Sequence, residues 1–184
     1  MKRYIITILA LASFTFASQF LTNGDFEEPL MNGWQQSMYG AGSSINRGTD
    51  YDGDPDYEAF VYKGTGDGYA RLYQIVDVPT TDLEFSVNAK LYAYSTSASC
   101  WAGAAVVISY LNESDSLLGE TMICYRSYAC PWANTSTRHI IAVTDSLWNN
   151  YALNIDDELL NLSGVDAADI TRIQVSLLGT ADSG

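Results

Sequence analysis

The chain has 184 residues and a formal net charge of −13, from 22 acidic and 9 basic side chains. The length suits one domain, and a hydrophobic content of 47% excludes an acidic disordered tail, which buries too little apolar surface to offset the entropy lost on folding. The acid excess argues against binding to nucleic acid, whose phosphates need clustered Lys and Arg, and a single His with three Cys leaves little room for a zinc framework.

Residues 1–17 have the pattern of a secretory signal peptide. Lys2 and Arg3 give a basic start, residues 4–12 are apolar but too short to span a bilayer, and small residues lead up to Ala17. The alternative is an amphipathic or core helix, which the polar, Gly-rich segment that follows disfavours. We expect cleavage after Ala17 and a secreted, extracellular or cell-surface protein in which disulfides can form. No later apolar stretch is long enough to predict a membrane span.

Residues 18–184 alternate between apolar and polar side chains, which is the period of a β-strand. Runs of this kind predict strands at residues 69–78, 83–94, 104–110, 151–155 and 173–177. The run at 83–94 is the longest, with odd-numbered apolar residues on one face and even-numbered polar ones on the other. Only residues 156–162 and 166–169 are predicted to be helical. The pattern favours one all-β domain, an antiparallel β-sandwich.

The segment Leu21-Thr-Asn-Gly-Asp-Phe-Glu-Glu28, followed by Gly33-Trp34, resembles the opening of secreted carbohydrate-binding modules of the galactose-binding-like jelly-roll type. Residues 73–79, 83–91, 148–155 and 170–177 are similar to later strands of these modules, so the resemblance covers most of residues 18–184. It implies a jelly-roll sandwich that binds carbohydrate. A β-sandwich of another kind could open in the same way, with Phe26 and Trp34 as apolar anchors on either side of the first turn.

The end of the sequence departs from this family. The resembling modules close with a strand that carries a Phe-Asp-Asp-Val-like sequence, whereas residues 179–184 are predicted to form the turn before it. The resemblance thus implies that the domain at 18–184 lacks its last strand. Either the sequence is a fragment that further domains follow, or this protein closes differently.

Two acidic segments are candidates for calcium. In the resembling modules a structural Ca²⁺ lies near the opening motif, and the resemblance places Glu27, with Asp25 as second choice, among its ligands. The alternative is a pair of solvated acids. A second cluster at 50–56 has carboxylates at every second residue but lacks the glycine and glutamate of an EF-hand loop. It is either a solvated loop or one that a cation organises.

Aromatic side chains supply the expected sugar contacts, because a flat ring stacks on the apolar face of a sugar while polar groups bind its hydroxyls. The alternative for each of them is core packing. The candidate ligand residues are Tyr92, Tyr94 and Asn88 on the polar face of the strand predicted at 83–94, and Trp101, Tyr125 and Trp132 in or beside irregular, Cys-containing segments.

Cys124 and Cys130 flank a short loop, so a disulfide between them is slightly favoured, although Cys100 could pair with either. Thiol catalysis needs an activating base. The single candidate, His139, lies in an apolar run, which favours inert cysteines.

No serine-hydrolase elbow, zinc-protease helix or phosphate loop is present in the sequence. We therefore predict a secreted, non-catalytic carbohydrate-binding module for a glycan or polysaccharide, an accessory module if a larger glycoside-active protein contains it. One alternative is a cell-surface structural or adhesive β-sandwich without a sugar site. Another is a hydrolase whose carboxylate pair is hidden among the acidic residues.

Overall fold

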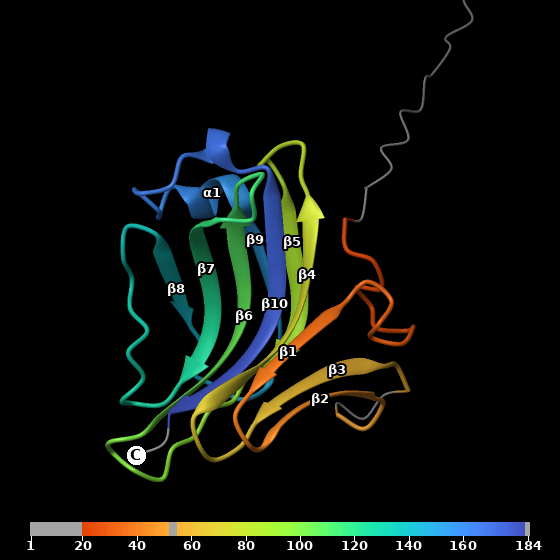
Figure 1. Ribbon diagram of the computed structural model, residues 1–184, viewed down its shortest axis with the longest axis vertical. Coiled ribbons are helices and arrows are strands. Elements are labelled where there is room, and N and C mark those ends of the chain that lie inside the picture. Colours follow the sequence, from red (N-terminus) through yellow and green to blue (C-terminus); the bar gives the residue numbers. More distant parts are fainter. Residues whose placement is uncertain (1–19, 52–54, 183–184) are drawn as a thin grey trace, which may run out of the picture.

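The computed structural model describes residues 20–51 and 55–182. The predicted signal peptide and the middle of the acidic cluster at 50–56, with Asp52 and Asp54, lie outside these ranges. The described chain is mostly β, with a short α-helix and a 3₁₀ turn (Figure 1). Its elements are β1 (Gln35–Tyr39), β2 (Ser43–Gly48), β3 (Glu58–Lys63), β4 (Gly68–Asp77), β5 (Glu84–Lys90), β6 (Trp101–Leu111), β7 (Leu117–Arg126), β8 (Arg138–Ala142), β9 (Trp148–Asn154), α1 (Ile155–Leu159), the 3₁₀ turn (Ala167–Asp169) and β10 (Arg172–Asp182).

Six strands form the larger sheet, in the order β1-β4-β10-β6-β7-β8 (Figure 1). Neighbouring strands are antiparallel except β7 and β8, which run parallel. The prediction of a purely antiparallel sandwich is therefore wrong at this edge. The physical reason is the connection at 127–137, which returns along the length of β7 before β8 begins, as a parallel neighbour requires.

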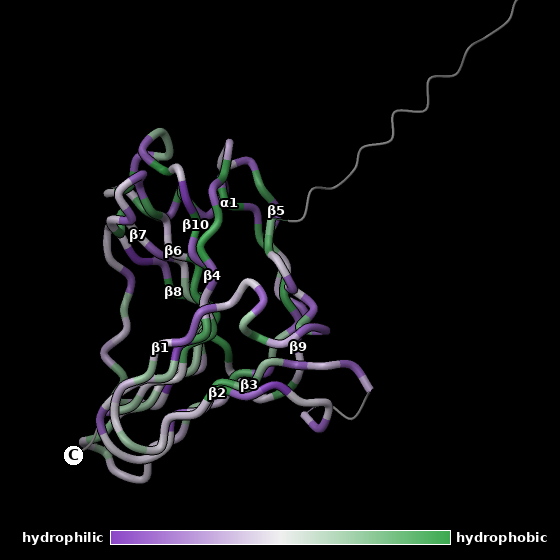
Figure 2. Tube along the Cα trace, turned by 45° about the vertical axis from the view of Figure 1, so that its right-hand side comes forward, coloured by the Kyte–Doolittle hydropathy of each residue, from purple (hydrophilic) through white to green (hydrophobic). Residues whose placement is uncertain are grey.

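Two small antiparallel sheets, β2–β3 and β5–β9, cover one face of the larger sheet, which we call its inner face. Val61 of β3 packs into the same cluster as Leu72 of β4. Phe85 of β5 packs against Val106 and Ile123 of the larger sheet. In the turned view of Figure 2, the larger sheet lies on one side and β5–β9 on the other, with β2–β3 below. The fold is a two-layered β-sandwich, as predicted.

The alternation at residues 83–94 is present, although the strand is shorter than predicted. Odd-numbered side chains in this run are buried or half-buried, and even-numbered ones are exposed. Pairing of β5 with β9 ends at Lys90, because β9 begins at its partner Trp148. The chain keeps its alternation to Tyr94 without a strand partner, so the side chains beyond Lys90 extend past the end of the small sheet.

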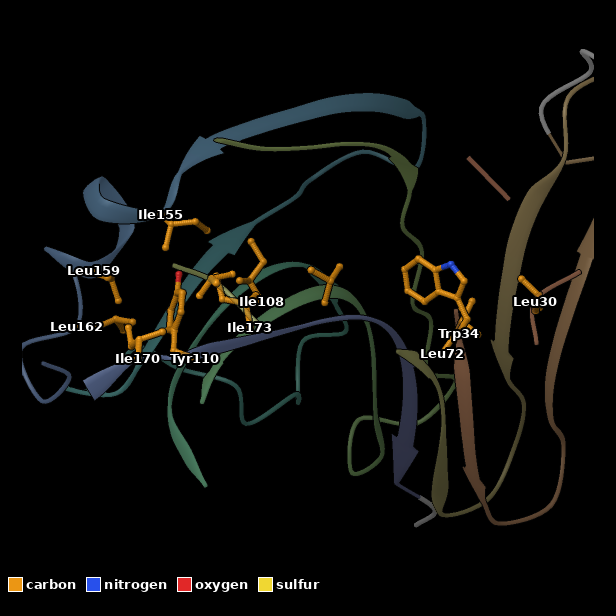
Figure 3. Packing of buried hydrophobic residues seen from close by; sticks show 12 residues of the cluster. Leu30, Trp34, Leu72, Ile108, Tyr110, Ile155, Leu159, Leu162, Ile170 and Ile173 are labelled. Carbon is orange, nitrogen blue, oxygen red and sulfur yellow. The ribbon is translucent and has the colours of Figure 1, made fainter. Parts of the chain in front are cut away.

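The main core lies between the layers and extends to α1 (Figure 3). Tyr110 of β6 is fully buried, and burial raises the pKa of its hydroxyl to about 12. This hydroxyl lies 2.9 Å from the hydroxyl of Thr121, which donates to Oε2 of Glu158 at 3.3 Å. The same carboxylate oxygen is 2.6 Å from Nδ1 of His139. These contacts join β6, β7, β8 and α1 at one end of the sandwich.

Residues 20–34 form a compact loop ahead of β1. Asn23 closes it, because its side chain donates to the carbonyl of Glu28 and accepts the N–H of the same residue, both at 2.9 Å. Trp34 is only 6% exposed, its indole N–H donates to the carbonyl of Asn23 at 2.9 Å, and its ring centroid is 5.2 Å from that of Phe26. The two rings therefore anchor the loop, as the motif predicted.

Residues 179–182 are not the turn that the sequence predicted, because β10 continues through them to Asp182. Gly179 is paired with Ala70 of β4 on one side and with Ala104 of β6 on the other. Hydrogen bonds to two neighbouring strands outweigh the weak strand preference of glycine. This part of the chain thus occupies the middle of the larger sheet.

Both short helical predictions are confirmed. α1 spans Ile155–Leu159, and Asn154 caps it by accepting the N–H of Asp157. The 3₁₀ turn at Ala167–Asp169 is capped in the same way by Asp166. Over residues 20–51 and 55–182, no helix has the length and apolar character needed to cross a membrane.

Candidate functional site

The face of the larger sheet that is turned away from the two small sheets, its outer face, carries an open hollow of about 590 Å³. It extends across five strands, from β1 to β7. The lining residues are Ser37, Tyr69, Arg71, Tyr73, Ile75, Ser109, Leu111, Asp115, Leu117, Glu120 and Gln174.

One wall of the hollow comes from alternate residues of β4. Leu72 and Gln74 of this strand point inward and are buried. Successive side chains of a strand point to opposite faces, so Tyr69, Arg71 and Tyr73 point outward. A short stretch of one strand therefore supplies two aromatic rings with a cation between them.

Strand register determines which residues form the floor of the hollow, because residues directly opposite each other on two paired strands point to the same face of the sheet. Gln174 of β10 is opposite Ile75 of β4 and opposite Ser109 of β6. Ser109 is in turn opposite Glu120 of β7. Gln174, Ser109 and Glu120 thus form a polar row across three neighbouring strands, and Ile75 of β4 lies at its end.

The tyrosines of the wall are held in place by their hydroxyls. The hydroxyl of Tyr73 donates to Oε1 of Gln35 at 3.0 Å, and that of Tyr69 lies 3.1 Å from Oγ of Ser37. Tyr69 also packs against the exposed ring of Tyr39, with ring centroids 6.4 Å apart. Fixed rings lose little side-chain entropy when a ligand stacks on them.

The two carboxylates of the hollow are both engaged by arginines. Oε1 of Glu120 accepts a hydrogen bond from Nε of Arg138 at 2.6 Å. Asp115 accepts a hydrogen bond from the guanidinium of Arg172. A substrate or ion would have to compete with these guanidinium groups for the carboxylate oxygens.

The predicted residues Tyr92, Tyr94, Asn88 and Tyr125 do not line the hollow. Tyr92 and Tyr94 are 59% and 67% exposed, and Asn88 is exposed on β5 opposite Asn150. The structure brings Tyr92 against Tyr125 of β7, with ring centroids 5.5 Å apart. We call Asn88, Tyr92, Tyr94 and Tyr125 the tyrosine edge; it is a second exposed aromatic surface.

The predicted residues Trp101 and Trp132 contact each other on the outer face, with ring centroids 6.3 Å apart. Trp132 is only 9% exposed, and it covers Gly103 of β6. Trp101 hydrogen-bonds the carboxylate of Asp182, and the pKa of that carboxyl is raised because it shares a hydrogen bond with Asp67. Trp132 thus has a packing role in this structure, and Trp101 borders it.

Cys124 and Cys130 are buried in one cluster with Trp132, and both are thiols in this structure. Burial raises the pKa of both, that of Cys124 to about 11. Their location in one cluster is compatible with the predicted pairing, which stays a prediction.

The residues expected to bind calcium lie in the loop at 20–34. Oε1 of Glu27 accepts the N–H of Tyr57 at 3.1 Å, and Oδ1 of Asp25 accepts the N–H of Glu27 at 3.4 Å. In the part of the chain that the structure describes, no group of three or more His, Cys, Asp or Glu side chains is arranged to hold a metal ion. Calcium at Glu27 and Asp25 stays a prediction.

The residues of the hollow were not predicted from the sequence. For the wall, the sequence does contain a pattern that indicates a shared face, because Tyr69, Arg71 and Tyr73 recur at period two inside the strand predicted at 69–78. No such signal exists for the floor, which depends on the register of strands distant in sequence.

No protein-family model and no curated protein matches the chain. Among solved structures it is similar to the enzymatically active domain of tailspike protein 4 of bacteriophage CBA120, with 16% identity and a TM-score of 0.50 over 90% of this chain. The chain spans 20% of that tailspike chain. A loop-swap mutant of Xyn11A of Necallimastix patriciarum matches with 10% identity and a TM-score of 0.41, over 82% of this chain and 88% of that one. The tailspike similarity supports the β-sandwich fold.

Proposed function

We propose that this protein is a secreted, non-catalytic carbohydrate-binding domain whose ligand lies in the hollow of the outer face. The observation that carries the proposal is the row of outward side chains on β4, where Tyr69 and Tyr73 flank Arg71 beside the polar floor. Flat rings next to hydrogen-bonding groups match the alternating apolar and polar faces of a sugar.

The resemblance of the opening motif supports the finer fold, a jelly-roll sandwich of the galactose-binding-like type, and with it a calcium ion at Glu27. The N-terminal pattern supports secretion or display at the cell surface. The similar tailspike domain is described as enzymatically active, so the fold itself is compatible with either binding or catalysis.

Two contacts favour binding over hydrolysis. Glycoside hydrolysis uses a pair of carboxyl groups on either side of the scissile bond. The carboxylates that line the hollow, Glu120 and Asp115, are held by Arg138 and Arg172 instead. We therefore assign the hollow a recognition role.

Affinity electrophoresis of the mature chain through gels that contain neutral or acidic polysaccharides tests this function. We expect retardation on at least one polymer, and a loss of about tenfold in affinity for Tyr69→Ala and Tyr73→Ala, the effect of ~1.4 kcal/mol. Tyr94→Ala, a change of the same kind on the tyrosine edge, is the matched control and should migrate as the parent does. Far-UV circular dichroism establishes that each variant is folded.

Three other outcomes are informative. Loss of binding in Tyr94→Ala but not in Tyr69→Ala would transfer the site to the tyrosine edge. No retardation on any polysaccharide would favour the structural or adhesive alternative. Release of reducing sugar by the parent protein would contradict the non-catalytic assignment.

A further inference from the structure

Arg71 differs from the other arginines of the described chain. Its Nε is buried, and among residues 20–51 and 55–182 this atom has no hydrogen-bond partner. The other arginines in these ranges are engaged: Arg47 with the carbonyl of Phe26, Arg126 with the carbonyl of Trp132, Arg138 with Glu120, and Arg172 with Asp115. Nε of Arg172 is also buried without a hydrogen-bond partner, but it lies 3.0 Å from Oδ1 of Asp77 in an ion pair.

A buried guanidinium nitrogen without a hydrogen-bond partner lowers the stability of the fold. Taking part of a guanidinium out of water without a compensating hydrogen bond is unfavourable, and such groups in native proteins are few. Leu72, its neighbour on β4, points into the core, so the guanidinium extends from the opposite side of the strand into the hollow. Across the ladders, Arg71 is opposite Ser37 of β1 and Leu178 of β10, neither of which carries a charge.

We propose that Arg71 binds the carboxylate of an acidic sugar, so that the ligand of the hollow is a uronic-acid polysaccharide. This inference rests on the proposed function and names its ligand class. A guanidinium presents two parallel N–H groups that match the two oxygens of a carboxylate. Tyr69 and Tyr73 lie two residues away on either side, at the right spacing to contact the sugar ring that carries the carboxylate.

The net charge of −13 does not prevent this interaction. At physiological salt, charges farther apart than about 8 Å are largely screened, so the groups near the ligand decide. Around the hollow, Glu120 pairs with Arg138, and Arg172 is shared between Asp115 and Asp77. Among the described residues, Arg71 forms no ion pair, so its guanidinium is a point of positive charge in the hollow of a strongly acidic protein.

The test is affinity electrophoresis on polygalacturonate and on the same polymer as its methyl ester, in which each sugar carries a neutral ester in place of the carboxylate. We expect retardation by the acid form and at least tenfold weaker retardation by the ester. Arg71→Gln should bind the acid form about tenfold to a hundredfold more weakly, and Arg71→Lys should lose part of that affinity because it keeps the charge without the paired N–H groups. Lys90→Gln, which removes an exposed positive charge from β5, is the matched control.

Two readouts separate this inference from the function on which it rests. Binding to the ester or another neutral polymer that depends on Tyr69 but not on Arg71 would overturn the acidic ligand and leave the binding function intact. An equal loss in Lys90→Gln and Arg71→Gln would also overturn it, because binding would then follow net charge. Retention of polygalacturonate should weaken as salt rises, and no binding to any polymer would refute the function itself.

Discussion

Replacing Gly103 by alanine tests whether Trp132 is fixed on the outer face. The backbone of Gly103 is not in the left-handed region, so alanine fits its conformation. At a strand position with free space, this change stabilises by about 0.4–1 kcal/mol, because it restricts the unfolded chain. A Cβ at Gly103 would however lie 2.5 Å and 2.6 Å from two ring carbons of Trp132. The structure therefore predicts that Gly103→Ala destabilises the protein instead of stabilising it.

The size of the effect follows from the overlap. Carbon atoms in contact lie about 3.5–4 Å apart, so the indole ring must move by about 1 Å. It is packed in a cluster with Ala105 and Cys124, which limits that movement. Overpacking of this kind costs about 1–3 kcal/mol. After the gain in the unfolded state is subtracted, we expect Gly103→Ala to lower the free energy of unfolding by about 1 kcal/mol, the difference between the middles of the two ranges.

Urea unfolding of four proteins, followed by far-UV circular dichroism, measures this coupling: the parent, Gly103→Ala, Trp132→Ala and the double variant. In the Trp132→Ala background the indole ring that would clash with the new Cβ is absent, so Gly103→Ala should be neutral or stabilising. Gly179→Ala on the neighbouring strand is the control, because its Cβ would meet other atoms at no less than 3.4 Å. If Gly103→Ala stabilises both backgrounds equally, Trp132 does not cover β6.

Three further predictions concern packing and thiol chemistry. Gln74→Leu should destabilise by about 1–3 kcal/mol, because the buried amide of Gln74 accepts the N–H of Thr22 at 2.7 Å and donates to its carbonyl at 2.9 Å; an unchanged urea midpoint would contradict this. Glu158→Gln removes the negative charge of the carboxylate that lies 2.6 Å from Nδ1 of His139 and should lower the free energy of unfolding by about 1 kcal/mol, which the same titration measures. In the reduced protein, Cys124 should react slowly with a disulfide reagent at pH 8, because burial raises the pKa of its thiol to about 11 and leaves little thiolate; reaction as fast as in urea would be inconsistent with its burial.

Strands with one buried face and one solvent-exposed face could be predicted from the sequence. The runs at 69–78 and 83–94 alternate because one side meets the core and the other meets water, and both correspond to strands of the structure. The faces were predicted correctly as well, down to the exposure of Tyr92 and Tyr94. Local patterning of this kind needs no knowledge of the partner strand.

Strands covered on both faces gave no such signal. Residues 121–124 of β7 are all buried, because β5–β9 covers the inner face there and the connection at 127–137, with Trp132 and Cys130, covers the outer face. This part of the strand therefore shows no alternation of apolar and polar residues that would reveal it as a strand. The parallel pairing of β8 with β7 is likewise a consequence of where that connection runs, which no local pattern encodes.

The same distinction explains why the two aromatic surfaces were not equally visible. Three of the four residues of the tyrosine edge come from one contiguous run, at 88–94, and Tyr125 of β7 joins them. The hollow instead joins Ser37, Arg71, Gln174 and Glu120 from four strands whose register is set by the whole sheet. The surfaces differ in one property that a ligand can report. The hollow contains a guanidinium whose Nε has no partner in the described chain, whereas the tyrosine edge is formed by uncharged residues. Lys90 lies on the same face of β5 as Asn88, so a preference for the acidic polysaccharide identifies the hollow when Arg71→Gln abolishes it and Lys90→Gln does not.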